Sequence, residues 1–207
     1  GIRVDYDLDN LTGGKIYIDN VTNTSYDAIY AEGNVYNIGD IIIGSRGPIA
    51  GDGLLFYQLS FPAYTFTNAA GGKLEIDQTG GHGISNYFDT FSNSGSIIIG
   101  ATGTIGGLGV RNLGTINNNA SGELIVHRAA GTSGIRNFHH FTNNGIIEIG
   151  ELGDIRTYAI NNENFGSAWF SNASCSAVII IHSDDIIADL KNSFTNSGLI
   201  IENASGT

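Results

Sequence analysis

The sequence lacks methionine altogether and contains only two prolines, one cysteine and one tryptophan among its 207 residues. Charged residues are also few, at 14%. Strong helix formers are therefore scarce, whereas 30 glycines and many isoleucines and asparagines supply β-branched and turn-forming residues, which disfavours a helical fold. The single cysteine, Cys175, excludes an internal disulfide, and its place in an apolar run predicts a small buried side chain.

Positive charge is also in short supply. Nine lysines and arginines stand against 20 aspartates and glutamates, which gives a net charge of −11. Because no basic stripe is present to neutralise phosphates, we expect no nucleic acid as a partner. No run reaches the roughly 18 apolar residues that a membrane helix needs, so we expect no membrane insertion.

One short sequence motif occurs eight times along the chain. Each copy centres on an asparagine that precedes a glycine-containing corner and an aliphatic stretch, as in "FSNSGSIIIG" and "FTNNGIIEIG". Successive spacings between the anchors are 27, 31, 25, 25, 25, 29 and 24 residues. Such a regular period is typical of a solenoid. The anchors are Asn10, Asn37, Asn68, Asn93, Asn118, Asn143, Asn172 and Asn196.

The copies alternate between a short and a long form. In the short form a glycine follows the anchor by two residues, and in the long form a glycine or serine follows it by four. The sequence unit is therefore a double repeat of about 50 residues, present four times. The short corners contain Gly39, Gly95, Gly145 and Gly198, and the long corners contain Gly14, Gly72, Gly122 and Ser176.

Periodicity within each copy predicts the fold. Phe91, Asn93, Gly95, Ile97 and Ile99 share one parity, which indicates a strand with one buried face. Further short strands are expected at "GISN" before the anchor and at "GTIGG" after the isoleucines. We predict an all-β, right-handed parallel β-helix (solenoid) of about eight coils in four two-coil repeats, with 1–207 as a single domain. At about 4.8 Å per coil the rod is about 38 Å long.

An asparagine on the inward face is costly unless its amide is satisfied. Stacked coils allow each asparagine to donate to one neighbouring anchor and accept from the other, so we predict a structural ladder of all eight anchors. The corner glycines are expected to supply a positive φ. A phenylalanine stack beside the ladder should contain Phe66, Phe91, Phe141, Phe170 and Phe194.

The residue between the two inward aliphatic residues of each coil is expected to face outward. Six of these eight positions are apolar or aromatic, which favours a lateral contact with another rod or partner; the alternative is ordinary β-branched filling of a strand. The six candidates are Tyr17, Ile42, Ile98, Ile125, Ile179 and Ile201, and the other two positions are Glu75 and Glu148.

Two coils are longer than the others, and both carry aromatic residues in the extra length. Loops on a rigid solenoid are places where binding develops, and aromatic rings there could stack on sugars or contact a partner protein. The alternative is local packing. The candidate glycan or partner residues are Phe56, Tyr57, Phe61, Tyr64, Phe165 and Trp169.

Catalysis and metal binding are alternatives with weaker sequence support. "HSDDIIADLK" offers His182, Asp184, Asp185, Asp189 and Lys191, but adjacent aspartates on a strand point to opposite faces. Asp5, Asp7 and Asp9 alternate near the start and suggest a calcium site. Arg3, Arg111 and Arg136 occupy the same phase of different coils and predict an exposed stripe. A solvated surface is the alternative for each group, so we predict no catalytic residue, no cofactor and no resident metal.

The wording "FTNSG", "FTNNGIIEIG" and "GIRNFHHFTNNG" resembles the coils of long secreted surface proteins of bacteria, most of all the adhesin-like arrays that Bacteroidetes export by the type IX route. It is more loosely similar to autotransporter and filamentous haemagglutinin passengers. The resemblance implies an extracellular or cell-surface, non-enzymatic, structural or adhesive role, with a surface glycan or a protein of a host or neighbouring cell as partner.

Both ends of the sequence read as parts of coils. "GIRVDYDLDN" aligns with "GIRNFHHFTN", and "IIENASGT" aligns with "IIGATGT". We therefore expect either a segment of a longer array or a subunit that stacks head to tail into a filament. The second class of function is a carbohydrate-active module, either a glycan binder or a polysaccharide lyase or hydrolase.

Overall fold

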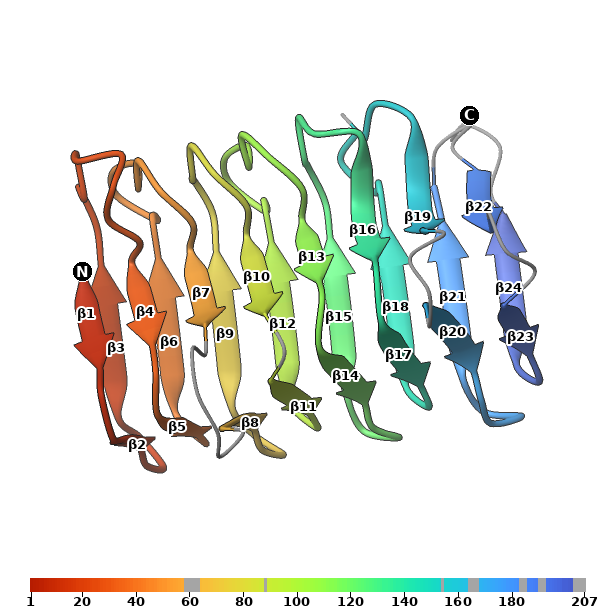
Figure 1. Ribbon diagram of the computed structural model, residues 1–207, viewed down its shortest axis with the longest axis horizontal. Coiled ribbons are helices and arrows are strands. Elements are labelled where there is room, and N and C mark those ends of the chain that lie inside the picture. Colours follow the sequence, from red (N-terminus) through yellow and green to blue (C-terminus); the bar gives the residue numbers. More distant parts are fainter. Residues whose placement is uncertain are drawn as a thin grey trace.

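The computed structural model describes residues 1–57, 64–87, 89–153, 155–163, 168–182, 186–189 and 193–202. These residues form 24 short strands in three eight-stranded sheets, in which every strand pair is parallel. Each sheet takes one strand from every coil, so the chain makes seven turns between its first and eighth coils (Figure 1). Within the described residues there is no helix long and apolar enough to cross a lipid bilayer.

Sheet A contains β1 (Ile2–Val4), β4 (Ile29–Ala31), β7 (Leu54–Tyr57), β10 (Ile84–Tyr87), β13 (Val110–Asn112), β16 (Ser133–Asn137), β19 (Tyr158–Asn162) and β22 (Ile186–Asp189). Sheet B contains β2 (Asp7–Asn10), β5 (Asn34–Asn37), β8 (Thr65–Asn68), β11 (Thr90–Asn93), β14 (Thr115–Asn118), β17 (His140–Asn143), β20 (Trp169–Asn172) and β23 (Phe194–Asn196). Sheet C contains β3 (Lys15–Ile18), β6 (Asp40–Ile43), β9 (Lys73–Ile76), β12 (Ser96–Ile99), β15 (Glu123–Val126), β18 (Ile146–Ile149), β21 (Val178–Ile181) and β24 (Leu199–Glu202).

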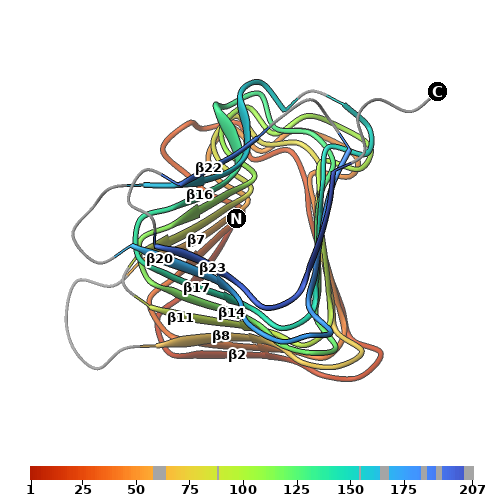
Figure 2. The ribbon, with the colours of Figure 1, turned by 90° about the vertical axis from the view of Figure 1, so that its right-hand side faces the viewer.

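The three sheets enclose a roughly triangular cross-section (Figure 2). Viewed from the C-terminal end, the chain passes from sheet A to sheet B to sheet C in an anticlockwise sense while it approaches the viewer. The coil is therefore right-handed, as predicted and as crossover connections between parallel strands almost always are.

The sequence motif around each anchor asparagine was predicted as one strand, but it forms two. "FSN" and "SIII" belong to two strands, β11 and β12, that meet at a corner containing Gly95. The strand expected at "GTIGG" is reduced to a single-residue bridge, in which Ile105 pairs with Thr79 and Ala129. Only one apolar residue lies between the glycines there, which leaves too little side chain to hold a longer strand.

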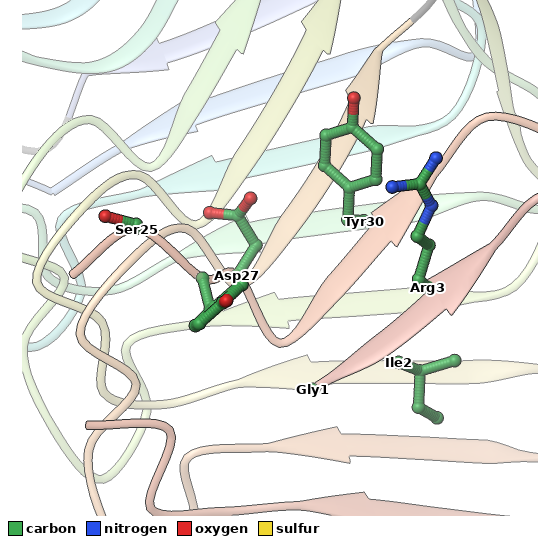
Figure 3. A pocket seen from close by; sticks show the side chains of 7 residues that line it. Gly1, Ile2, Arg3, Ser25, Asp27 and Tyr30 are labelled. Carbon is green, nitrogen blue, oxygen red and sulfur yellow. The ribbon is translucent and has the colours of Figure 1, made fainter. Parts of the chain in front are cut away.

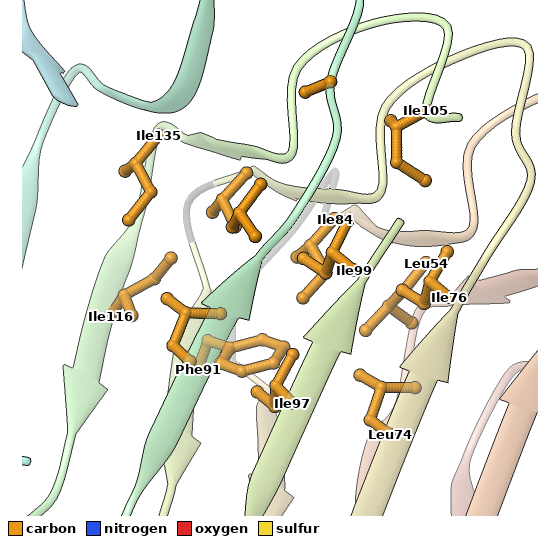
Figure 4. Close-up of a cluster of buried hydrophobic side chains, with 14 of the residues drawn as sticks. Leu54, Leu74, Ile76, Ile84, Phe91, Ile97, Ile99, Ile105, Ile116 and Ile135 are labelled. Carbon is orange, nitrogen blue, oxygen red and sulfur yellow. The ribbon is translucent and has the colours of Figure 1, made fainter. Parts of the chain in front are cut away.

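Inward side chains of all three sheets fill the core. Leu74, Ile97 and Ile99 from sheet C face Ile84 from sheet A inside the coil (Figure 4). The predicted phenylalanine stack forms as two separate pieces, because Ile116 occupies the position between Phe91 and Phe141.

Ring spacings in the two pieces are those of stacked aromatic pairs. Phe66 and Phe91 lie 4.5 Å apart between centroids, Phe141 and Phe170 lie 4.6 Å apart, and Phe170 and Phe194 lie 5.3 Å apart.

The predicted asparagine ladder is confirmed in full, and it is directional. At each of its seven steps Nδ2 of one anchor donates to Oδ1 of the anchor in the next coil towards the C-terminus, over 2.7–2.9 Å. The second hydrogen of each Nδ2 reaches a backbone carbonyl of that next coil, as from Asn118 to Ile146 over 3.0 Å. The amides are buried except at Asn196, so the ladder satisfies polar groups that would otherwise be costly.

A second asparagine ladder runs through sheet A and was not predicted. Asn86 donates to Asn112 over 3.0 Å, Asn112 to Asn137 over 2.8 Å, and Asn137 to Asn162 over 2.8 Å. The sequence feature that could have predicted this ladder is the asparagine at the end of "GISN", "GVRN" and "GIRN", which recurs at intervals of 25 or 26 residues. Phe56 occupies this position one coil before Asn86, and Oδ1 of Asn86 is buried without a hydrogen-bond partner in the described part of the chain.

The corner glycines are required by contact and not by their backbone angles. The prediction of a positive φ at the short corners was wrong, since neither Gly95 nor any equivalent glycine has one. A Cβ at Gly95 would lie 2.3 Å from the carbonyl oxygen of Gly72 in the preceding coil, so a side chain would separate the coils. Positive φ occurs instead at the glycine that ends the short repeats, as in Gly100 (φ 74°), and in two long corners at the glycine one residue before the predicted one, Gly13 and Gly71 (φ 78° and 88°).

The seventh coil has one extra residue in its corner between Asn172 and Val178. Val178 pairs with Ile146 and Ile179 with Ile147, one position later than the long corner of the other coils would give. A shift of one residue exchanges the two faces of a strand. Ile179 is consequently fully buried, and Ile180 takes the outward position. Cys175 lies in this corner and is exposed, so the prediction of a buried cysteine was also wrong.

Candidate binding surfaces

The outward column of sheet C is confirmed in position, with one correction. Tyr17, Ile42, Ile98, Ile125 and Ile201 share one register along the sheet. The sixth member is Ile180 and not Ile179, for the reason given above. Glu75 and Glu148 interrupt the column and accept from Lys73 and from His182, respectively. The column is thus a mixed apolar and ion-paired face.

The aromatic residues of the two long coils that the structure describes lie in different surroundings and form no common loop site. Phe56 lies in β7 and is fully buried in the core, because it faces inward at the position of the second ladder. Tyr64 packs partly against the core, and its backbone N–H donates to Asp89 over 3.0 Å. Trp169 is 39% exposed on β20 and contacts the ring of His140 edge-on. Phe61 and Phe165 lie outside the described residues.

The three aspartates proposed for calcium are spread along the surface. Asp5 pairs with Arg3 over 2.6 Å, Asp7 accepts from Asn34 over 2.9 Å, and Asp9 is exposed two residues further along the strand. The described residues contain no group of three or more histidine, cysteine, aspartate or glutamate side chains that could hold a metal ion. Of the "HSDDIIADLK" candidates, His182 pairs with Glu148 over 2.7 Å, while Asp184, Asp185 and Lys191 lie outside the described residues, as does the side chain of Asp189.

Half-buried aspartates in the loops between sheets C and A hold the backbone of neighbouring coils. Asp27 accepts the N–H of Asp52 over 2.8 Å, and Asp52 accepts the N–H of His82 over 2.7 Å. Nδ1 of His82 accepts the N–H of Leu108 over 2.9 Å, which continues the series into a fourth coil. Asp52 also accepts from the hydroxyl of Ser85 over 2.6 Å.

Burial shifts the pKa values of two members of this series, Asp27 and His82. Desolvation, with a smaller effect of the Asp52 charge, raises the pKa of Asp27 above its ordinary value. Desolvation lowers the pKa of His82, and the charges of Arg111 and Arg136 lower it further, although Asp52 opposes them. His82 is therefore poised to remain neutral, as its acceptor role at Nδ1 requires.

The outward face of sheet A carries a line of aromatic and cationic side chains that crosses six coils. We call it the arginine–aromatic track. In the first four coils the guanidinium of Arg3 lies 5.6 Å from the ring centroid of Tyr30. The ring centroids of Tyr30 and Tyr57 are 6.4 Å apart, and those of Tyr57 and Tyr87 are 5.4 Å apart. The members of the track are Arg3, Tyr30, Tyr57, Tyr87, Arg111, Arg136 and Phe138.

Two arginines continue the track in the fifth and sixth coils. Arg111 lies over Tyr87 at 4.9 Å, donates to its hydroxyl, and lies 6.0 Å from the ring of Phe138. The guanidinium of Arg136, the register partner of Arg111, lies 4.8 Å from the centroid of the same Phe138 ring. Nε and Nη2 of Arg136 both donate to Glu163, over 2.8 and 2.7 Å. The predicted common phase of Arg3, Arg111 and Arg136 is confirmed.

The track begins in a shallow pocket of about 390 Å³ at the first coils (Figure 3). Arg3 and Tyr30 form one side of it, and the carboxylate of Asp27 lies on the other. Cationic, phenolic and carboxylate groups thus open onto one hollow. The lining residues are Gly1, Ile2, Arg3, Ser25, Tyr26, Asp27 and Tyr30.

No protein-family model, curated protein or solved structure matches the chain. Its class therefore rests on its own geometry. Three parallel eight-stranded sheets, the repeats and the two asparagine ladders define a parallel β-solenoid.

Proposed function

We propose that the chain is a non-enzymatic structural and adhesive rod on the outside of a bacterial cell, which spaces, joins or presents surfaces. The unbroken asparagine ladder carries this proposal. Eight buried or terminal rungs joined by seven directional hydrogen bonds favour one stacking register along the whole rod. Such a rod resists bending, because a slipped register would leave amides unpaired.

Four buried or half-buried carboxylates support a structural role. Asp27, Asp52, Asp77 and Asp89 each accept a backbone N–H from another coil, at 2.7–3.0 Å. Each is therefore engaged in holding two coils together. The likeness of the coil wording to secreted bacterial surface proteins supports the extracellular placement.

Stacking beyond the described coils is part of the proposal. The ladder points one way, so the edge at Asn10 presents the accepting side of a rung and the edge at Asn196 presents the donating side. A further coil, from the same chain or from another copy, fits either edge only in the head-to-tail sense. Parallel strands of β1 to β3 and β22 to β24 offer their backbone groups in the same sense.

Two measurements test the proposal. Electron microscopy of the purified chain at rising concentration is expected to show rods of constant width that lengthen; monodisperse short rods at every concentration would overturn the self-stacking. Antibody labelling of intact cells that express the natural protein is expected to mark their surface. Label only after permeabilisation would overturn the extracellular role.

A carbohydrate-active module is the second candidate function. The arginine–aromatic track is the observation that favours it, because aromatic rings and arginines beside one another suit binding of a sugar chain. Among the two forms of this candidate, the track supports a binder more than a lyase or hydrolase.

A further inference from the structure

We propose that the arginine–aromatic track is a binding site for a carboxylate-bearing glycan that lies along the rod axis, with Arg111 and Arg136 as its anchor. This proposal rests on the adhesive role proposed above and names the surface and the ligand class for it. The site differs from the long loops that the sequence suggested, since it is built on strands of sheet A.

The charge of the anchor argues for an anionic ligand. Arg111 and Arg136 are register partners on neighbouring parallel strands, where like charges repel. Glu163 neutralises Arg136, whereas Arg111 has no carboxylate partner within the described part of the chain. A guanidinium with no carboxylate partner among the described residues is thus held in place on a protein with a net charge of −11. An anion bound between the two arginines removes the repulsion.

The guanidinium of Arg111 is also held in a fixed orientation. It lies between the rings of Tyr87 and Phe138, 4.9 and 6.0 Å from their centroids, and one of its nitrogens donates to the Tyr87 hydroxyl. Its other N–H groups form the planar fork that matches a carboxylate with two parallel hydrogen bonds. Because the side chain is already ordered, binding costs little conformational entropy.

A buried polar atom beside the anchor supports a ligand as well. Asn161 is the register partner of Arg136 in the next coil and is 6% exposed. Its Nδ2 donates to Glu163 over 3.0 Å, but its Oδ1 has no hydrogen-bond partner among the residues that the structure describes. A hydroxyl donor of a ligand on Arg136 would satisfy that oxygen, and a sugar carries hydroxyls next to its carboxylate.

The shape of the track favours a sugar chain over a small anion. Tyr30, Tyr57 and Tyr87 continue from the anchor towards the N-terminal coils, with ring separations of 6.4 and 5.4 Å. Half-buried aromatic rings at intervals of one coil provide apolar platforms for successive sugar rings. The track ends in the pocket lined by Arg3, whose guanidinium is already paired with Asp5 and Glu32 over 2.6 and 2.7 Å, so Arg111 and Arg136 remain the anchor for the carboxylate.

The test uses the full chain on an array of carboxylated glycans and their carboxyl-reduced neutral counterparts, followed by calorimetry with the best carboxylated oligomer. We expect retention of the carboxylated members only, with affinity that falls as salt is raised. Arg111→Gln should weaken binding about tenfold or more, and Arg111→Lys should recover part of it, because lysine keeps the charge but lacks the fork.

Arg46→Gln is the matched control. Arg46 also lies over a tyrosine, 5.5 Å from the Tyr17 ring, but on another face of the rod. Its variant should bind like the unaltered chain. Equal binding of neutral glycans, unchanged binding by Arg111→Gln, or no glycan retained at all would overturn the site. Equally tight binding of polyglutamate would overturn the sugar specificity. None of these results alters rod length in electron microscopy, so the structural proposal is judged separately.

Discussion

Loss of one interior rung tests the ladder most directly. In Asn118→Ala, Nδ2 of Asn93 loses its acceptor at 2.8 Å, and Oδ1 of Asn143 loses its donor at 2.8 Å. The other hydrogen of Asn93 still reaches Glu123 over 3.0 Å, and Oδ1 of Asn143 still accepts from Gly145 over 3.2 Å. The variant therefore leaves one buried N–H without a partner.

An unsatisfied buried donor costs about 1–3 kcal/mol, and each net hydrogen bond lost adds about 0.5–1.5 kcal/mol. We expect Asn118→Ala to lower the free energy of unfolding by about 2–4 kcal/mol. For a chain of this size this corresponds to roughly 5–15 °C in melting temperature. Circular dichroism during thermal and urea unfolding measures both quantities.

Asn117→Ala is the matched control, in the same strand and of the same chemistry. Asn117 points outward from β14 and is half-buried, and its side chain makes no hydrogen bond within the described residues. Its replacement should change stability by less than about 0.5 kcal/mol. If Asn118→Ala is no more destabilised than Asn117→Ala, the ladder does not stabilise the rod and the reasoning is refuted.

Three further predictions concern corners and loops. Gly95→Ala should destabilise the rod by about 1–3 kcal/mol in urea unfolding, because the new Cβ meets a backbone oxygen. Gly71→Ala is the control: Gly71 has φ 88° and open space around it, so the variant should cost only about 1–2 kcal/mol of backbone strain. A larger loss of stability in Gly71→Ala than in Gly95→Ala would contradict the contact argument. Because the pKa of His82 is lowered in the folded protein, the free energy of unfolding should fall as pH drops below about 6.5. His82→Asn keeps an acceptor for the N–H of Leu108 but does not titrate, so the free energy of unfolding should fall less steeply with pH in this variant. The same pH dependence in the variant and the unaltered chain would exclude His82 as the cause. At lower pH the raised pKa of Asp27 acts oppositely, with stability gained as pH falls towards 3.8. Cys175 should react with a thiol reagent in the folded protein at the rate of a free thiol, whereas protection until unfolding would show that it is buried.

The anchors could be predicted from the sequence because their spacing repeats the geometry of one coil. Identical residues at the same phase must stack, so Asn10 to Asn196 specified the register of sheet B without any structure. The same logic located Arg3, Arg111 and Arg136 in one column.

The sequence predictions were wrong at positions where the same residue type fits two different structural roles. Gly95 lies at a corner, and both a positive φ and a close contact call for glycine; only the backbone of the preceding coil distinguishes them. Ile179 was misplaced because an extra residue in a corner is invisible in a run of three isoleucines, each of which fits either face. Phe56 resembled a loop aromatic because its column changes from apolar residues to asparagine after the third coil.

The second ladder was missed for a related reason. Its asparagines occur only in the fourth to seventh coils, so the column did not appear as a repeat of the whole chain. The arginine–aromatic track could not be read from sequence either. Tyr30 and Tyr57 occupy different outward positions of their strands and meet only through side-chain length.

The partial length of the second ladder bears on how the chain selects its fold. A nascent coil that skips two coils and stacks on the next would match Asn with Asn in sheet B and would keep the alternation of short and long corners, so the anchor repeat alone allows such an error. In sheet A the same slip would stack Ala31 of the second coil against Asn112 of the fifth, and Asn112 would lose the hydrogen bond that it accepts from Asn86. The change from Phe56 to Asn86 occurs at one place only in the described coils. It therefore makes the native stacking register more stable than a register displaced by two coils.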